Sequence, residues 1–134
     1  MKILVGYKGV NVGKELLKLA AIHAKAFHGE VLIVTSMKGG EKTEQSKVKA
    51  KITEAEENLE KARQYFDEQG VKSEDHLLVR GFEAGEDIIN FAKEKKVDEI
   101  IIGVKSRSKV GKLIFGSTAQ AVILRGPCPV VTVK

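Results

Sequence analysis

The sequence is poor in several residue types, and their scarcity narrows what the protein can be. It has one cysteine (Cys128), two prolines and no tryptophan. A single cysteine excludes a disulfide framework within the chain and makes a reducing, cytoplasmic environment the default expectation. No apolar run approaches the roughly 20 residues needed to cross a bilayer. The N-terminus, MKILVGYK, goes straight into a strand-like pattern without a signal-peptide core, so we expect no membrane partner.

Acidic residues are missing from the C-terminal part of the chain. No Asp or Glu follows Glu99, whereas residues 100–134 carry six Lys and Arg, against a net charge of +5 for the whole chain. The excess positive charge is therefore local, and much of it lies in GVKSRSKVGKLIFGS, residues 103–117. A nucleic-acid-binding surface would spread its charge more widely. The only aromatic residue there, Phe115, makes no stacking platform, so the pattern argues against nucleic acid as a partner.

Composition and periodicity indicate a single α/β domain spanning residues 1–134. Hydrophobic residues make up 43% and charged residues 31% of the chain, as in globular proteins with one core. Short apolar runs rich in β-branched residues predict strands, and apolar residues spaced three or four apart predict helices. The predicted strands are 3–7, 31–35, 77–79, 99–102 and 130–133, and the predicted helices lie between Asn11 and Gly29 and over 48–66, 84–95 and 118–125.

This alternation predicts the topology of the sheet. Apolar strands separated by helices imply a parallel sheet with helices on both faces. Right-handed crossovers then give a doubly wound, five-stranded sheet of order 3-2-1-4-5, a Rossmann-like or flavodoxin-like fold. In that order the switch point lies between strands 1 and 4, where ligands bind at the carboxyl ends of the strands. Residues 103–117 leave strand 4 at that end, so we expect a ligand site there.

Familiar phosphate motifs do not fit the chain. A Walker A loop would need glycine at 106 and Ser or Thr at 113, where the sequence has Ser106 and Leu113. No GxGxxG occurs. A phospho-acceptor receiver domain would need acidic residues after strand 1 and an Asp after strand 3, where Lys8 and Arg80 stand. These three classes of protein are therefore set aside.

Metal and catalytic patterns find no support either. The histidines at 23, 28 and 76 have no Cys, His or carboxylate partner at metal-ligand spacing. Cys128 lies between two prolines at the start of a predicted strand, which favours a structural role. No nucleophile with a base and no paired carboxylates stand out. We therefore expect no enzyme. Slow hydrolysis of bound ATP needs few protein groups and stays open, but no catalytic constellation supports it.

The glycine- and serine-rich end of the 103–117 segment remains. Gly116-Ser117-Thr118 begins a predicted helix, whose free N–H groups and dipole would attract an anion. The hydroxyls of Ser117 and Thr118 and the charges of Lys105 and Arg107 would add to such a site. The other interpretation is that Ser117 only caps the helix and the cations are solvated. The residues alone leave both interpretations open.

Four segments carry a resemblance to a known family: KILVGYKG, GFEAGEDIINFAKEKKVDEIIIG, GVKSRSKVGKLIFGS and ILRGPCPVVTVK. The third has Gly103, then Ser106 after two residues, then Gly116-Ser117 after nine more. Over nearly its whole length the chain resembles the universal stress protein family of the UspA type. The nucleotide motif of that family is Gly, two residues, Gly, nine residues, and Gly-Ser or Gly-Thr.

The resemblance implies a fold, a ligand and a partner. The fold is the 3-2-1-4-5 sheet, similar to that of adenine nucleotide alpha hydrolases, in a module that acts in the stress response. The ligand is an adenine nucleotide, ATP or AMP, with or without Mg²⁺. The partner is a second copy, in a homodimer formed through the last strand, Val130, Val131, Thr132 and Val133. The residues expected to bind the nucleotide are Tyr7, Lys8, Ser36, Gly103, Lys105, Ser106, Arg107, Gly116, Ser117 and Thr118.

Two residues depart from the family pattern. Ser106 replaces the middle glycine of the motif, and its Cβ restricts φ. Lys8 stands where the family usually has Asp. A carboxylate that could accept hydrogen bonds from ribose hydroxyls is therefore replaced by a cation that cannot. These departures keep an alternative function open, a homodimeric interaction module that binds no nucleotide.

Overall fold

The protein has four helices and five strands in the part of the chain that the computed structural model describes, residues 1–8, 13–38, 45–104 and 116–134. In chain order these are β1 (Lys2–Gly6), α1 (Gly13–Phe27), β2 (Glu30–Met37), α2 (Gln45–Glu68), β3 (Ser73–Val79), α3 (Ala84–Lys95), β4 (Glu99–Gly103), α4 (Ser117–Arg125) and β5 (Val130–Val133). The strands form one parallel sheet of order β3-β2-β1-β4-β5, which confirms the predicted fold.

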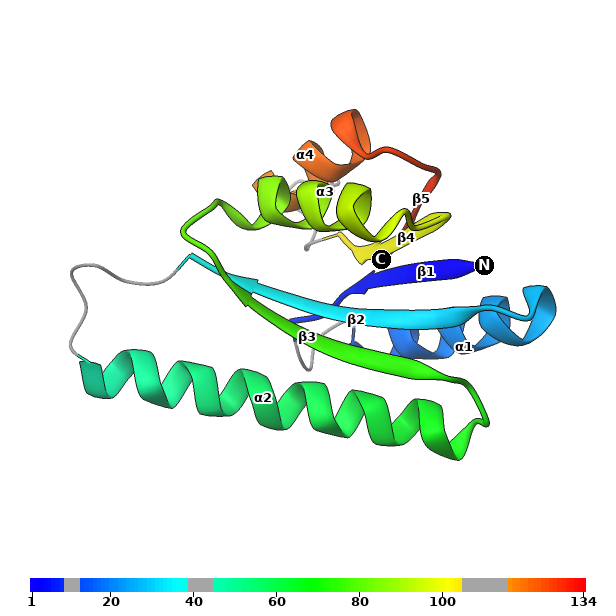
Figure 1. The fold of residues 1–134 in the computed structure, drawn as a ribbon, viewed down its shortest axis with the longest axis horizontal. Coiled ribbons are helices and arrows are strands. Elements are labelled where there is room, and N and C mark those ends of the chain that lie inside the picture. The colour runs from blue at the N-terminus through cyan, green and yellow to red at the C-terminus, as the bar shows by residue number, and fades with distance from the viewer. Residues whose placement is uncertain (9–12, 39–44, 105–115) are drawn as a thin grey trace, which may run out of the picture.

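Helices cover both faces of the sheet, α1 and α2 on one side and α3 and α4 on the other (Figure 1). The central strand β1 shows why both faces are apolar. Val5 and Ile33 lie side by side in the β1–β2 register and belong to the core beneath α1 and α2. Leu4 and Ile100, paired between β1 and β4, belong to the core beneath α3 and α4. The continuous apolar runs of the central strands are therefore the signature of a sheet buried on both sides.

The edge strand β3 is longer than its apolar residues predicted. Only residues 77–79 were expected in a strand, but β3 begins at Ser73 and pairs with β2 from Val31 onward. His76 therefore lies in the middle of β3. Because β3 has a neighbour on one side only, it tolerates the polar Ser73–His76 half, whose side chains are mostly half-buried or exposed. An edge strand of this kind gives little apolar signal in the sequence.

The helices match their predicted positions within a few residues. Helix α3 has the predicted bounds, whereas α2 extends beyond the predicted 48–66 at both ends. Helix α1 begins at Gly13, and Asn11, which marked the predicted start of this helix, lies outside the described residues. Helix α4 ends before Gly126 as expected, but Gly126 is extended rather than left-handed. A Cβ atom there would lie 2.6 Å from the carbonyl oxygen of Val122, so glycine is needed for a close approach.

Candidate functional site

The switch point of the sheet lies between β1 and β4, which pair directly from Ile3–Glu99 to Gly6–Ile102. The next element after β1 is α1, on one face of the sheet, and the next element after β4 is α4, on the other face (Figure 1). Gly103 is the last residue of β4 and pairs with Val133 of β5. The predicted site residues Lys105, Ser106 and Arg107 lie outside the described residues.

The N-terminus of α4 is the second component of the site. Gly116 is the N-cap, with extended backbone and no side-chain hydrogen bond to the cap, and its carbonyl accepts the N–H of Gln120 at 3.0 Å. Ser117 is exposed and Thr118 half-buried in the first turn. Since the first N–H groups of a helix have no partner within it, they are available to an anion. Ser117 is therefore the first residue of the helix rather than its cap.

Tyr7 and Lys8 follow β1 at the same edge of the sheet. Tyr7 is buried, and its N–H donates to the carbonyl of Val34 at 2.9 Å. The hydroxyl of Thr35 donates to the carbonyl of Tyr7 at 2.6 Å. Burial raises the pKa of the Tyr7 phenol, so the ring stays neutral. The next residue, Lys8, is exposed, which places a cation at the end of β1.

The ring of Tyr7 lies against the beginning of α1. A Cβ atom added at Gly13 would lie 2.9 Å from Cε2 of Tyr7. Glycine at this position therefore lets the first turn of α1 approach the ring closely. The ring of Tyr7 thus packs between β1 and α1. Its backbone, rather than its hydroxyl, makes the contacts with the end of β2.

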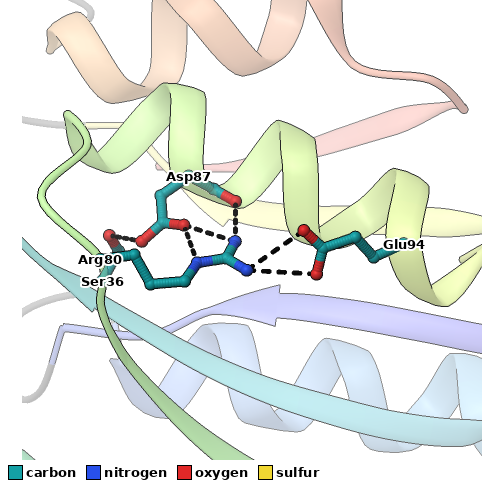
Figure 2. Close-up of polar contacts among 4 residues, drawn as sticks. All are labelled: Ser36, Arg80, Asp87 and Glu94. Carbon is teal, nitrogen blue, oxygen red and sulfur yellow. Dashed lines mark hydrogen bonds and ion pairs between the residues drawn. The ribbon is translucent and has the colours of Figure 1, made fainter.

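Ser36, the predicted site residue on β2, has its side chain occupied. Its hydroxyl donates to Oδ2 of Asp87 at 2.8 Å, in a contact that is buried between β2 and α3 (Figure 2). Asp87, which no sequence motif predicted, is completely buried in the first turn of α3. One signal was available, because Asp87 precedes the buried Ile88 and Ile89 and lies four residues before Phe91, on an otherwise apolar helix face.

Arg80 holds the other carboxylate oxygen of Asp87. Its Nε donates to Oδ1 at 2.7 Å, and its Nη1 contacts both carboxylate oxygens of Glu94 at 3.1 Å (Figure 2). The guanidinium also lies 5.9 Å from the ring centroid of Phe91. Desolvation acts to lower the pKa of Arg80, but its hydrogen bonds to Asp87 and Glu94 outweigh that effect and raise it. Arg80 follows the last residue of β3 directly, so the contacts join the ends of β2, β3 and α3.

Other polar contacts lie at the opposite end of β4. Nδ1 of His23 in α1 is 2.6 Å from Oε1 of Glu99, the first residue of β4. Cys128 is a free, half-buried thiol whose pKa is raised by burial and by the negative charges of Asp98 and Glu99. Among the described residues, no group of three or more His, Cys, Asp or Glu could hold a metal ion. No helix in that part of the chain is long and apolar enough to span a membrane.

The order of the strands, the helices on both faces and the switch point between β1 and β4 define a Rossmann-like α/β protein. Comparison with protein families identifies the particular family. The model described as the universal stress protein family matches residues 1–134, so the chain belongs to that family.

Individual relatives agree with this assignment. A universal stress protein of Thermus aquaticus is 31% identical over 98% of this chain and 97% of its own length. The solved structure of a universal stress protein from Archaeoglobus fulgidus superimposes with a TM-score of 0.87 at 38% identity, covering 99% of this chain and 97% of that one. Another structure from Archaeoglobus fulgidus, 33% identical with a TM-score of 0.81 over 99% and 96% of the two chains, is a complex with dAMP.

Proposed function

We propose that this universal stress protein binds an adenine nucleotide at the carboxyl edge of its sheet and acts in the stress response. The proposal rests on the positions of two parts of the family motif. Gly103 lies at the end of β4, and Gly116-Ser117 lies at the start of α4. No side chain among the described residues caps α4, so its first N–H groups would attract an anion beside the switch point. The dAMP complex of a protein 33% identical to this one supports the ligand class.

The roles of the individual residues follow from their positions. Ser117 and Thr118 offer hydroxyls beside the free N–H groups of α4, so this end would hold the phosphates. Lys8 offers a cation at the end of β1 but no acceptor for ribose hydroxyls. We therefore propose that it attracts phosphate. Lys105, Ser106 and Arg107 would complete the site from the segment that follows β4, and the end of β2 at Ser36 would contribute backbone groups.

Isothermal titration calorimetry with AMP, dAMP and ATP, each with and without Mg²⁺, tests the proposal. Gly116→Val should weaken binding because a branched side chain would stand at the cap where the phosphates are expected. Leu124→Val is the matched control, since it introduces the same residue at a position of α4 that is 80% exposed. Absence of heat with the wild-type protein at millimolar nucleotide contradicts the proposal.

The alternative function is a homodimeric interaction module without nucleotide, and Lys8 is the observation that favours it. Its exposed side chain puts a cation where the family pattern has a carboxylate. The double variant Lys8→Asp with Ser106→Gly restores both family residues. If the wild-type protein binds no nucleotide and the double variant does, the alternative holds. Binding that the double variant weakens supports the nucleotide site with Lys8 as a phosphate contact.

We further propose a homodimer formed through β5, the outer strand of the sheet. The carbonyl of Pro129 accepts a hydrogen bond from the N–H of Ile100 in β4, and that of Val133 accepts one from Val104, directly after β4. Because backbone groups alternate in direction along a strand, those of Val130 and Thr132 point to the free edge. An edge of this kind is a template for a second copy.

Thr132→Pro tests the dimer because it removes an N–H from the free edge and leaves the β4 ladder intact. Light scattering should then report a monomer, whereas the wild-type protein should scatter as a dimer. Thr132→Val is the control, since it changes the exposed side chain and keeps the N–H. A dimer that persists in Thr132→Pro, or a monomeric wild-type protein, contradicts this arrangement.

A further inference from the structure

Asp87 is an uncommon residue for the interior of this protein. Its side chain is completely buried, yet it keeps two polar partners, the hydroxyl of Ser36 and the guanidinium of Arg80. Buried ion pairs add little net stability compared with well-packed apolar residues. The stability of the fold therefore does not explain why a carboxylate stands here, and its partners indicate what it does.

The contacts of Asp87 fix the end of β2. Ser36 is the next-to-last residue of that strand and points toward α3, where Asp87 accepts its hydrogen bond. Arg80 comes directly after β3, so Asp87 receives bonds from the ends of two neighbouring strands at once (Figure 2). Glu94 contacts the guanidinium only at Nη1, on the exposed side away from β2.

The end of β2 in turn holds the end of β1. Thr35 precedes Ser36 and faces the opposite side of the sheet, where its hydroxyl donates to the carbonyl of Tyr7 at 2.6 Å. The N–H of Tyr7 donates to Val34 on the same strand. Both backbone groups of Tyr7 are thus bound to β2, and Lys8 follows immediately at the switch point. A displacement of β2 at Ser36 would move Lys8.

We propose that Asp87 and Arg80 are positioning residues, which act through Ser36 and Thr35 to fix the backbone of Tyr7 and Lys8 at the switch point. The consequence for nucleotide affinity rests on the proposed function, whereas the consequence for the backbone does not. Neither residue contacts the ligand in this proposal. Their role is to hold the backbone of Tyr7, which Lys8 follows directly.

Three variants separate this role from a general effect on stability. Ser36→Ala removes the hydroxyl that joins β2 to Asp87, and Asp87→Asn removes the charge. Glu94→Gln is the matched control, because it removes a charge from the same guanidinium on the side away from β2, where Glu94 is 53% exposed. Should Asp87→Asn fail to fold, Ser36→Ala still tests the proposal, and Ser36→Thr should restore the wild-type behaviour by restoring the hydroxyl.

Amide hydrogen exchange measured by NMR is the first readout. In Ser36→Ala the N–H of Tyr7 should exchange about tenfold faster relative to amides at the centre of β2. The reason is that the carboxyl end of β2, to which Tyr7 is bound, opens locally. A purely structural role would speed the exchange of all these amides together and leave the ratio unchanged. That unchanged ratio, or an equal change in Glu94→Gln, would overturn the proposal.

Affinity for AMP, measured on fully folded protein, is the second readout. Ser36→Ala and Asp87→Asn should raise the Kd by roughly fivefold, and Glu94→Gln should leave it unchanged. If the wild-type protein binds none of AMP, dAMP and ATP, the proposed function fails, but the exchange ratio still decides whether the network positions Tyr7. If AMP binds and Ser36→Ala changes neither the Kd nor the ratio, the positioning role fails alone.

Discussion

A Cβ atom at Gly85 would lie 2.8 Å from the Cβ of Ala121, closer than real Cβ contacts allow. It would also lie 3.3 Å from Cα and from the carbonyl oxygen of Thr118. Gly85 is in the first turn of α3, and Thr118 is in the first turn of α4, where the phosphates are expected. The absence of a side chain at Gly85 therefore sets how deeply the N-terminus of α4 sits against α3.

We predict that Gly85→Val pushes the beginning of α4 outward. Overpacking of this kind costs about 1–3 kcal/mol, so urea denaturation should show a lower free energy of unfolding. Calorimetry should show weaker nucleotide binding, because the N–H groups of α4 move. Glu86→Val is the control, since it places the same residue at the next, exposed position of α3. Equal behaviour of the two variants would show that the close contact has no influence on the site.

A second prediction concerns the end of α3. Lys96 has a left-handed backbone, φ 54°, and its N–H bonds to the carbonyls of Ala92 and Lys93. That conformation is costly for a residue with a Cβ atom, whereas glycine adopts it freely. Lys96→Gly should therefore raise the free energy of unfolding by about 0.5–1 kcal/mol.

Lys95→Gly is the matched control for Lys96→Gly. Lys95 is the last residue of α3 and is helical, so glycine there should lower stability by up to about 1 kcal/mol. Thermal or urea denaturation of the two variants should give changes of opposite sign. Two changes of the same sign would mean that the backbone at Lys96 stores no strain.

The pair of His23 and Glu99 leads to a third prediction. The two side chains join α1 to the first residue of β4, at the end of the strand opposite the candidate site. Glu99 is only 12% exposed in this contact, so removal of one partner leaves a buried polar group without its bond. A double-mutant cycle with His23→Ala and Glu99→Ala should give a coupling energy of about 1 kcal/mol.

Nucleotide affinity provides the contrast for this cycle. Because the His23–Glu99 contact lies at the amino end of β4, all three variants should retain the wild-type Kd for AMP as long as they are folded. A coupling energy near zero would mean that solvent replaces the contact. A change in Kd would mean that this end of the sheet influences the site.

The fold followed from local pattern because its determinants are local. Runs such as residues 31–34 and 100–102 are apolar throughout, which indicates strands buried on both faces, and the handedness of crossovers then leaves few topologies. The start of α4 was also predictable, since Gly116-Ser117 marks a helix N-terminus. The length of β3 was not, because Ser73–His76 lie at the edge of the sheet and need no apolar side chains.

The hydrogen bond between Ser36 and Asp87 could not be predicted from the sequence. The family resemblance placed Ser36, which follows the predicted strand 31–35, in the site, but its partner Asp87 is 51 residues further along the chain. Neither hydrophobic periodicity nor motif spacing predicts such a contact, because it depends on how α3 packs against the sheet. The family motif covers only the glycines and hydroxyls between Gly103 and Ser117, and Asp87 and Arg80 are not part of it. A charged residue on the apolar face of α3 was the only local sign.

The last prediction is that Cys128 reacts slowly and contributes to the dependence of stability on pH. Burial, followed by the negative charges of Asp98 and Glu99, raises the pKa of this thiol in the folded protein. Since the thiolate is the reactive form, alkylation by iodoacetamide at pH 8 should be slower than that of a free cysteine peptide. The midpoint of the rate against pH should likewise lie above that of the peptide.

The same shift fixes the sign of the effect on stability. Above the ordinary pKa of a thiol, the unfolded chain loses the proton that folded Cys128 still binds. The contribution of protonated Cys128 to stability is therefore complete below the pKa of the unfolded chain. It declines as the pH rises through the pKa of Cys128 in the folded protein. Urea denaturation across this range should show a decline that is smaller in Cys128→Ala, where only other groups such as Tyr7 titrate. Equal declines in the two proteins, or alkylation as fast as that of the peptide, would mean that neither burial nor the charges of Asp98 and Glu99 raise the pKa of the thiol.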